Sequence, residues 1–153
     1  MTTDAFLERY GKLLSTPVFA VLVLAIVGLF YTHNLLGHGP VSIGLQVMAV
    51  LLMVWARVTF GLRSFHYAAN PTAGGLVTTG PYRYLRHPIY AAILLFLWTG
   101  VAVNASLLGV ALGLAATAML ALRIVFEERL VRQLYPEYDD YARRTKRVIP
   151  FIL

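Results

Sequence analysis

Residues 80–90 read G-P-Y-R-Y-L-R-H-P-I-Y, and the chain turns apolar directly after them. The stretch places three tyrosines, two arginines, one histidine and two prolines within eleven residues. Proline suits the first turn of a helix, because the N–H that it lacks would have no acceptor there. The sequence therefore predicts a helix that begins at Pro88, with a charged and aromatic cluster at its N-terminal end.

The composition indicates a membrane protein. Hydrophobic residues make up 59% of the 153 residues and charged residues 13%, whereas a soluble domain carries roughly 25% charged residues. The net charge of +6 does not indicate nucleic-acid binding, because the basic residues flank apolar blocks, as they do on the cytoplasmic side of membrane proteins. The chain has no cysteine, which excludes disulfides, thiolate metal sites and a catalytic thiol.

We expect an all-α integral membrane protein with a single domain over residues 1–153. The length of each apolar block is close to that of a helix that crosses a bilayer, about 20 residues. We expect the first span to begin at Pro17, after an interfacial helix or a frayed terminus over 1–15. The fourth helix should continue into water to about Leu134, since Glu127 and Glu128 are unfavourable at a helix C-terminus. The four predicted spans are 17–36, 41–59, 88–103 and 105–126, followed by a cytoplasmic, helical tail over 127–153.

The distribution of lysine and arginine predicts the orientation. The turn over 32–40 and the hairpin over 103–106 contain neither residue, and positive residues stay on the cytoplasmic side. Both termini should therefore face the cytoplasm, in a prokaryotic inner membrane or an endoplasmic-reticulum-like membrane. A stripe of small residues predicts close packing inside the molecule, on the third helix, and a monomer or weak dimer. The stripe consists of Ala105, Gly109, Gly113, Thr117 and Ala121.

Two antiparallel neighbours should bring the reactive residues together at the cytoplasmic end. The third helix begins beside His87 and the fourth passes Glu127 and Glu128, so His87 and Tyr90 should lie near both glutamates. A helix N-terminus attracts an anion such as a carboxylate, and glutamate with tyrosine can hold a cation or ribose hydroxyls. S-Adenosylmethionine has this mixture of groups. We also expect a surface ion pair between Glu128 and Arg132, four residues apart.

No metal site is predicted. His33 and His38 lie in the same short turn, and we interpret both as interfacial polar side chains rather than as ligands.

Several motifs from Arg57 onward resemble the isoprenylcysteine carboxyl methyltransferase family of integral membrane enzymes, to which the phospholipid N-methyltransferases are related. No single motif is specific, but the ordered set is. It consists of Leu76-Val77-Thr78, Gly80-Pro81-Tyr82, Arg86-His87-Pro88-Ile89-Tyr90, Glu127-Glu128, Tyr138-Asp139-Asp140-Tyr141 and Arg147-Val148-Ile149-Pro150-Phe151.

The resemblance implies S-adenosylmethionine-dependent methyl transfer to a lipophilic or lipid-linked acceptor, with membrane lipids around the protein. It implies that His87, Tyr90 and Tyr82 contact the cofactor, that Leu76 and Val77 meet the adenine through their backbone, and that Glu127 or Glu128 holds the ribose or the amino group. Some members have more than four spans, so the resemblance does not fix the acceptor.

The acceptor decides which catalytic groups are needed. A carboxylate needs an arginine to orient it, for which the candidates are Arg63, Arg132 and Arg143. An amine needs a base, for which the candidates are Glu128 and His87.

Two other functions remain open. One is a nicotinamide-dependent membrane reductase of the sterol-reductase-like type, although Ile89 stands where those proteins have an asparagine. The other is a membrane scaffold without catalytic activity.

Overall fold

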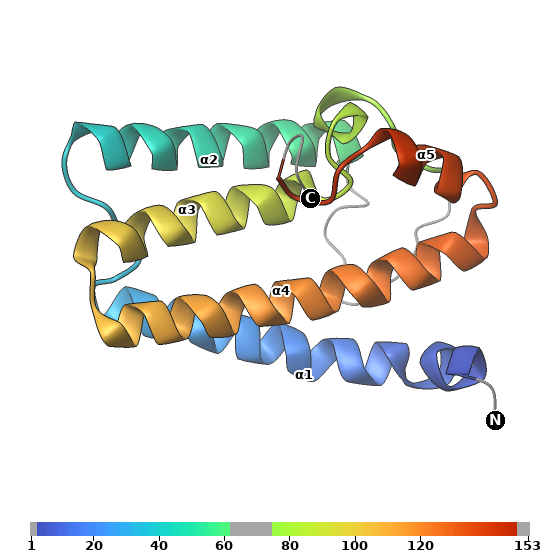
Figure 1. The fold of residues 1–153 in the computed structure, drawn as a ribbon, viewed down its shortest axis with the longest axis horizontal. Helices are drawn as coiled ribbons and strands as arrows, with labels where there is room; N and C mark the ends of the chain where they lie inside the picture. Colours follow the sequence, from blue (N-terminus) through green and yellow to red (C-terminus); the bar gives the residue numbers. More distant parts are fainter. Residues whose placement is uncertain (1–2, 62–74, 150–153) are drawn as a thin grey trace.

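The computed structural model describes residues 3–61 and 75–149, with side chains from Pro17 onward. Within these residues the protein is all-helical, with five α-helices and one short 3₁₀ helix (Figure 1). The helices are α1 (Thr3–Tyr31), α2 (Pro40–Phe60), η2 (Gly80–Arg83), α3 (Pro88–Asn104), α4 (Leu107–Leu134) and α5 (Tyr138–Arg144).

The predicted start of the first helix is wrong. Helix α1 begins at Thr3 and contains Pro17 in its interior, so no separate interfacial helix precedes it. A proline removes one intrahelical hydrogen bond, but helices in an apolar setting accommodate the loss through local adjustment. The sequence pattern of a proline ahead of an apolar block therefore did not mark a helix boundary here.

The predicted end of the first helix at Leu36 is also wrong. His33 has a φ of +57°, and the N–H of Asn34 donates to the carbonyl of Leu29 at 2.8 Å while that of His33 donates to Phe30 at 3.1 Å. This pair of bonds is a Schellman motif, which satisfies the last carbonyls of a helix. The motif ends α1 at Tyr31 and begins the connection to α2.

The other helices lie close to their predicted bounds. Pro40 and Pro88 each stand in the first turn of a helix, as their fixed φ favours. Between α3 and α4, Ala105 has a φ of +47° and the Ser106 side chain caps α4 by accepting from the N–H of Gly109 at 2.9 Å. Helix α4 continues past Glu127 and Glu128 to Leu134, as predicted.

The helices form two antiparallel pairs. Helix α1 packs along α4 and helix α2 along α3, and α3 also touches α4 (Figure 1). The core lies where α1, α3 and α4 meet, around Leu29, Leu97 and Leu120, which are fully buried. Only the middle of the predicted small-residue stripe faces α3, since Gly113 lies against Leu97 and Trp98 and the Trp98 indole donates to Thr117. Gly109 lies instead against Asn34, and Ala121 is exposed.

The α1–α2 connection is docked onto the bundle by a polar side chain in α2. The Gln46 amide donates to the carbonyls of Leu35 at 2.9 Å and Phe96 at 3.1 Å and accepts from the N–H of Gly37 at 3.0 Å. Gln46 is buried, so these bonds satisfy polar groups that would otherwise be costly. The connection and the α3–α4 hairpin therefore close the same end of the molecule (Figure 1).

Two helices, Pro40–Phe60 and Leu107–Leu134, are long and apolar enough to cross a membrane, and two shorter apolar segments accompany them, Pro17–Tyr31 and Pro88–Asn104.

Candidate functional site

A charged cluster lies at the end of the bundle where α3 begins. We define it as His87, Tyr90, Arg123, Glu127 and Glu128. His87 and Tyr90 are three residues apart and share one face of α3. Their rings stack at 5.5 Å between centroids, with 9° between their planes.

Glu127 is the centre of one half of the cluster. Its Oε1 accepts from the Tyr90 hydroxyl and from Arg123 Nη2 at 2.8 Å. Arg123 Nε also donates to the Tyr90 hydroxyl oxygen at 3.1 Å, and His87 Nδ1 lies 3.7 Å from Glu127 Oε2. The hairpin of α3 and α4 thus brings together the residues that the sequence analysis expected to meet.

Arg123 was not among the predicted site residues. It is 5% exposed, and its guanidinium also lies over the Phe19 ring of α1 at 5.4 Å. The signal was present in the sequence, because an arginine inside an apolar helix is expensive unless it is paired, and Glu127 stands four residues on, on the same face.

Glu128 is the centre of the other half and is 4% exposed. Its carboxylate accepts from Arg86 Nε at 3.0 Å and from Arg147 Nη2 at 3.1 Å. The expected ion pair with Arg132 does not form, because Arg132 pairs with Asp139 at 2.7 Å. Glu128 therefore faces inward, and its partners come from the segment before α3 and from the C-terminal tail.

The tail completes this end of the molecule by pairing with the backbone before α3. Lys146 N–H donates to the carbonyl of Tyr84 at 3.0 Å, and the N–H groups of Arg86 and His87 donate to the carbonyls of Lys146 and Arg147 at 2.7 and 2.9 Å. Arg86 Nη1 also donates to the carbonyls of Ala142 and Thr145. Because Arg86 also bonds to Glu128 of α4, it ties the tail to that helix.

A buried tyrosine adds a second tie between the tail and η2. The Tyr141 hydroxyl donates to the carbonyl of Tyr82 at 2.7 Å, and burial raises the pKa of Tyr141 to about 12. Burial also raises the pKa of Tyr82, whose ring packs on Phe60 at 5.4 Å. Both phenols therefore stay neutral at the pH of a cell.

One polar atom in the cluster has no hydrogen bond within the part of the chain that the structure describes. His87 Nε2 is buried and lies 3.4 Å from Glu128 Oε1 without bonding to it. Buried polar atoms are nearly always paired, so an unpaired one beside a glutamate and a tyrosine fits a site that takes a ligand group. The Glu127 side chain is 21% exposed against 5% for Glu128, so Glu127 is the more accessible of the two glutamates.

The remaining predicted residues lie outside the cluster's hydrogen bonds. Leu76 and Val77 are partly buried in a non-helical segment that leads into η2. Arg143 pairs with Asp140 on the exposed face of α5. Arg132, in the last turn of α4, pairs with Asp139 of α5. Arg63 lies outside the described residues. No group of three or more histidine, aspartate or glutamate side chains is placed to hold a metal ion in the ranges described.

The fold and the cluster define a class, a helical membrane protein with a buried polar site at one end of its bundle. A family model described as phospholipid methyltransferase matches residues 34–138, from the α1–α2 connection to the first residue of α5. The chain belongs to this family of membrane methyltransferases, which confirms the resemblance seen in the motifs.

The chain is also similar to individual proteins. It is 30% identical to the nickel-cobalt-cadmium resistance protein NccN of Alcaligenes xylosoxydans xylosoxydans, over 96% of this chain and 68% of that protein. It is 32% identical to the cobalt-zinc-cadmium resistance protein CzcN of Cupriavidus metallidurans, over 72% of this chain and 50% of that protein. A probable protein-S-isoprenylcysteine O-methyltransferase of Oryza sativa subsp. indica is 37% identical, over 50% of this chain and 41% of that protein.

The chain thus spans two thirds of the first relative and half or less of the other two. No solved structure matches it significantly.

Proposed function

We propose that the protein transfers a methyl group from S-adenosylmethionine to a lipophilic acceptor, and that the charged cluster is part of the cofactor site. Family membership supports the reaction class. The observation that carries the site is the buried His87 Nε2, which makes no hydrogen bond to the described residues and lies 3.4 Å from Glu128 Oε1, on the ring that faces the partly exposed Glu127.

Each residue of the cluster has a role in this proposal. His87 and Tyr90 present one stacked face to the cofactor, and Glu127 accepts from its ribose hydroxyls or its ammonium group. Arg123 fixes the Glu127 carboxylate and the Tyr90 hydroxyl in place, because it bonds to both. Glu128 holds the tail over the site through Arg86 and Arg147. The backbone of Leu76 and Val77 meets the adenine, near Tyr82.

For methyl transfer, the protein mainly has to align the cofactor with the acceptor and exclude water from the site. The cofactor supplies an activated methyl group on a sulfonium. A carboxylate acceptor is already a nucleophile near neutral pH and needs only orientation, which remains the proposed role of Arg132 or Arg143. An amine acceptor must lose a proton, and His87 suits that step better than Glu128, whose carboxylate is occupied by two guanidinium groups.

We further propose that four segments cross the membrane, with both termini on the cytoplasmic side. The two shorter apolar segments, Pro17–Tyr31 and Pro88–Asn104, each lie against one of the longer helices. The 17 residues of α3 extend roughly 26 Å at 1.5 Å per residue, slightly less than the hydrocarbon core. The charged cluster at the start of α3 would then lie just below the headgroups.

The first test is calorimetric binding of S-adenosylhomocysteine to the protein in detergent, with NADPH in a parallel titration. We expect the wild type to bind S-adenosylhomocysteine and His87→Ala to lose this binding, because the variant removes the ring that stacks on Tyr90. His33→Ala is the matched control, since His33 lies in the α1–α2 connection, at the end of the bundle away from the start of α3 (Figure 1).

Three outcomes would contradict the proposal. Unchanged binding by His87→Ala would place the cofactor elsewhere. Binding of NADPH alone would assign the site to a reductase, and binding of neither compound by folded protein would leave a scaffold.

A further inference from the structure

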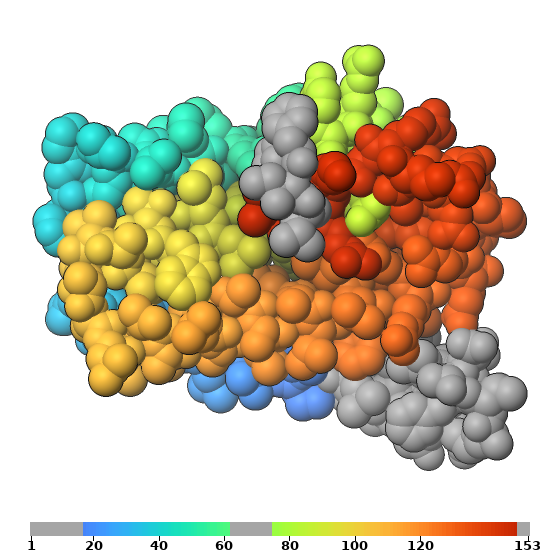
Figure 2. All heavy atoms as spheres, in the orientation of Figure 1, coloured from blue at the N-terminus to red at the C-terminus, as the bar shows by residue number. Residues whose placement is uncertain are grey.

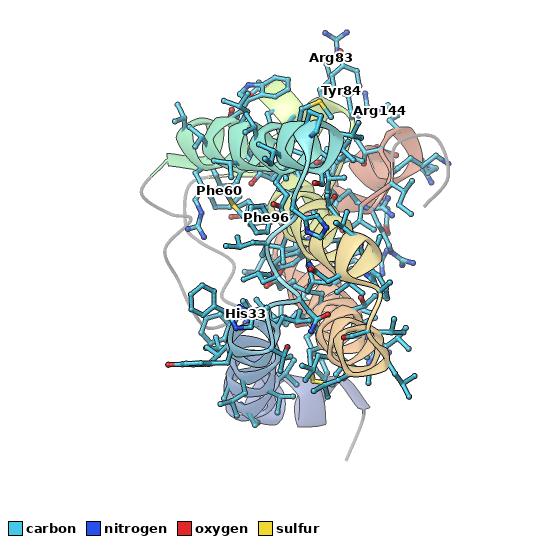
Figure 3. The ribbon with its side chains drawn as sticks, turned by 90° about the vertical axis from the view of Figure 1, so that its left-hand side faces the viewer. His33, Phe60, Arg83, Tyr84, Phe96 and Arg144 are labelled. Carbon is cyan, nitrogen blue, oxygen red and sulfur yellow. The ribbon has the colours of Figure 1, made fainter. Side chains whose placement is uncertain are left out.

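Four exposed residues from two distant parts of the chain form one cationic surface beside the charged cluster. We call it the cationic ledge, and it consists of Arg83, Tyr84, Arg144 and Lys146. The two parts are held together by backbone pairing, since Leu85 and Lys146 form a parallel bridge and the Lys146 N–H donates to the carbonyl of Tyr84. Arg83, Tyr84 and Arg144 project from the same side of the molecule, away from the bundle (Figure 3).

The charges of the ledge are not neutralised by the carboxylates that the structure describes. Among the residues that the structure describes, no carboxylate pairs with Arg83, Arg144 or Lys146. Arg144 Nε donates to the backbone carbonyl of Asp140 at 3.1 Å, while the Asp140 carboxylate pairs with Arg143. Three exposed cations without a described carboxylate partner and one exposed tyrosine are therefore held close together by the backbone pairing of the two segments.

An apolar surface adjoins the ledge. Helix α2 ends next to η2, where the Phe60 ring packs on Tyr82. Its last turns expose Val54, Trp55 and Val58, which are 52%, 51% and 74% exposed. Figure 2 shows η2 and α5 adjacent on the surface, at the end of the molecule where α2 terminates.

We propose that the cationic ledge binds the phosphate of an anionic phospholipid, whose acyl chains lie along the exposed end of α2. A phospholipid has charge and hydrocarbon in the same order as this surface, with cations above and an apolar belt below. An acidic soluble protein would match the cations but would leave Val54, Trp55 and Val58 in water. The ledge thus acts as a lipid site distinct from the cofactor cluster, and it does not depend on the reaction proposed above.

The tryptophans allow a direct test. The chain has two, so Trp98→Phe leaves Trp55 as the single reporter beside the ledge. The variant is reconstituted in vesicles, and its fluorescence is quenched with dibrominated phosphatidylglycerol or dibrominated phosphatidylcholine at equal mole fractions. We expect dibrominated phosphatidylglycerol to quench more strongly than dibrominated phosphatidylcholine. The ratio of the two quenching efficiencies should fall toward one when Arg83, Arg144 and Lys146 are all changed to glutamine.

The matched control changes Arg129, Arg132 and Arg143 to glutamine, which removes the same formal charge from other exposed residues, and it should keep the preference. Equal quenching by both lipids in the Trp98→Phe protein would overturn the proposal. The ledge would then bind another partner, such as an acidic protein. Loss of preference in the control would overturn it in favour of diffuse attraction by net charge. If Trp98→Phe does not fold, retention of phosphatidylglycerol over phosphatidylcholine in native mass spectra compares the same two triple variants with tryptophan 98 intact.

Discussion

Tyr141 joins the C-terminal tail to the segment before α3 through one buried hydroxyl, which donates to the carbonyl of Tyr82. Because burial raises the pKa of Tyr141 from 10 to about 12, the folded state keeps this proton at a pH where the unfolded chain has lost it. The stabilising contribution is fully present below about pH 10 and is lost as the pH rises toward 12.

We therefore expect the melting temperature of the wild type in detergent to fall between pH 10 and 12. At pH 8, Tyr141→Phe should already have a lower melting temperature than the wild type, because it lacks one hydrogen bond worth roughly 1 kcal/mol. Above pH 10, its melting temperature should fall less steeply with pH. The melting temperatures of both proteins are measured by circular dichroism at 222 nm over this pH range. Tyr31→Phe, at a tyrosine that is 76% exposed, is the control. Equal slopes for wild type and Tyr141→Phe would show that this proton does not govern alkaline stability.

Arg123 shows what a sequence reveals about single residues and what it does not. The antiparallel hairpin was enough to predict that His87 and Tyr90 meet Glu127 and Glu128. Arg123 was not predicted as a site residue, because it lies inside the predicted span over 105–126 and not in the motifs at the cytoplasmic end. The partners of Glu128 could not be predicted, because four-residue spacing favoured Arg132 and only tertiary contact brings Arg86 and Arg147 to it.

Among the elements, the α1–α2 connection depends most on close contact. A Cβ atom at Gly100 of α3 would lie 2.0 Å from the Leu35 carbonyl oxygen and 2.8 Å from that of Asn34. These are backbone atoms, so they cannot move aside without displacing the connection.

We expect Gly100→Ala to destabilise the protein by about 1–3 kcal/mol, as other overpacked sites do. The measurement is the melting temperature in detergent. Gly44→Ala in α2 is the control, because a Cβ there meets nothing within 4 Å and alanine is the better helix former. A variant at Gly100 as stable as the wild type would show that the connection is not packed against α3 as described.

The elements were predicted where the chain marks their ends. Pro88 and the hairpin over 103–106 marked the ends of α3 and α4, and α2, predicted over 41–59, differs by one residue at each end. Both predicted ends of α1 were wrong. Pro17 was interpreted as a helix start but lies inside the helix, and at the other end a histidine, rather than a glycine, takes the left-handed position of the Schellman motif. The pairing of residues 84–87 with 145–147 could not be predicted, since it is made by backbone groups that leave no side-chain pattern.

At the scale of the molecule, the arrangement proposed for the membrane is directly testable. The chain has no cysteine, so each single-cysteine variant reports one position without background. We expect His38→Cys and Leu107→Cys, at the closed end of the bundle, to react with a membrane-impermeant maleimide added to intact cells.

Arg144→Cys, at the opposite end, should react only after the cells are opened. Reaction of all three in intact cells, or of none, would rule out four spans with both termini inside. Reaction of Arg144→Cys alone would reverse the orientation.

The pairing of the tail with the backbone before α3 also determines when the site can exist during synthesis. Residues 84–87 are synthesised well before residues 146 and 147, and contacts so far apart in sequence form late and slowly. Until then Arg86 lacks the carbonyls of Ala142 and Thr145, and Glu128 lacks Arg147. A nascent chain that has all its apolar helices but not yet residues 142–147 would therefore still lack the partners that order Arg86 and Glu128.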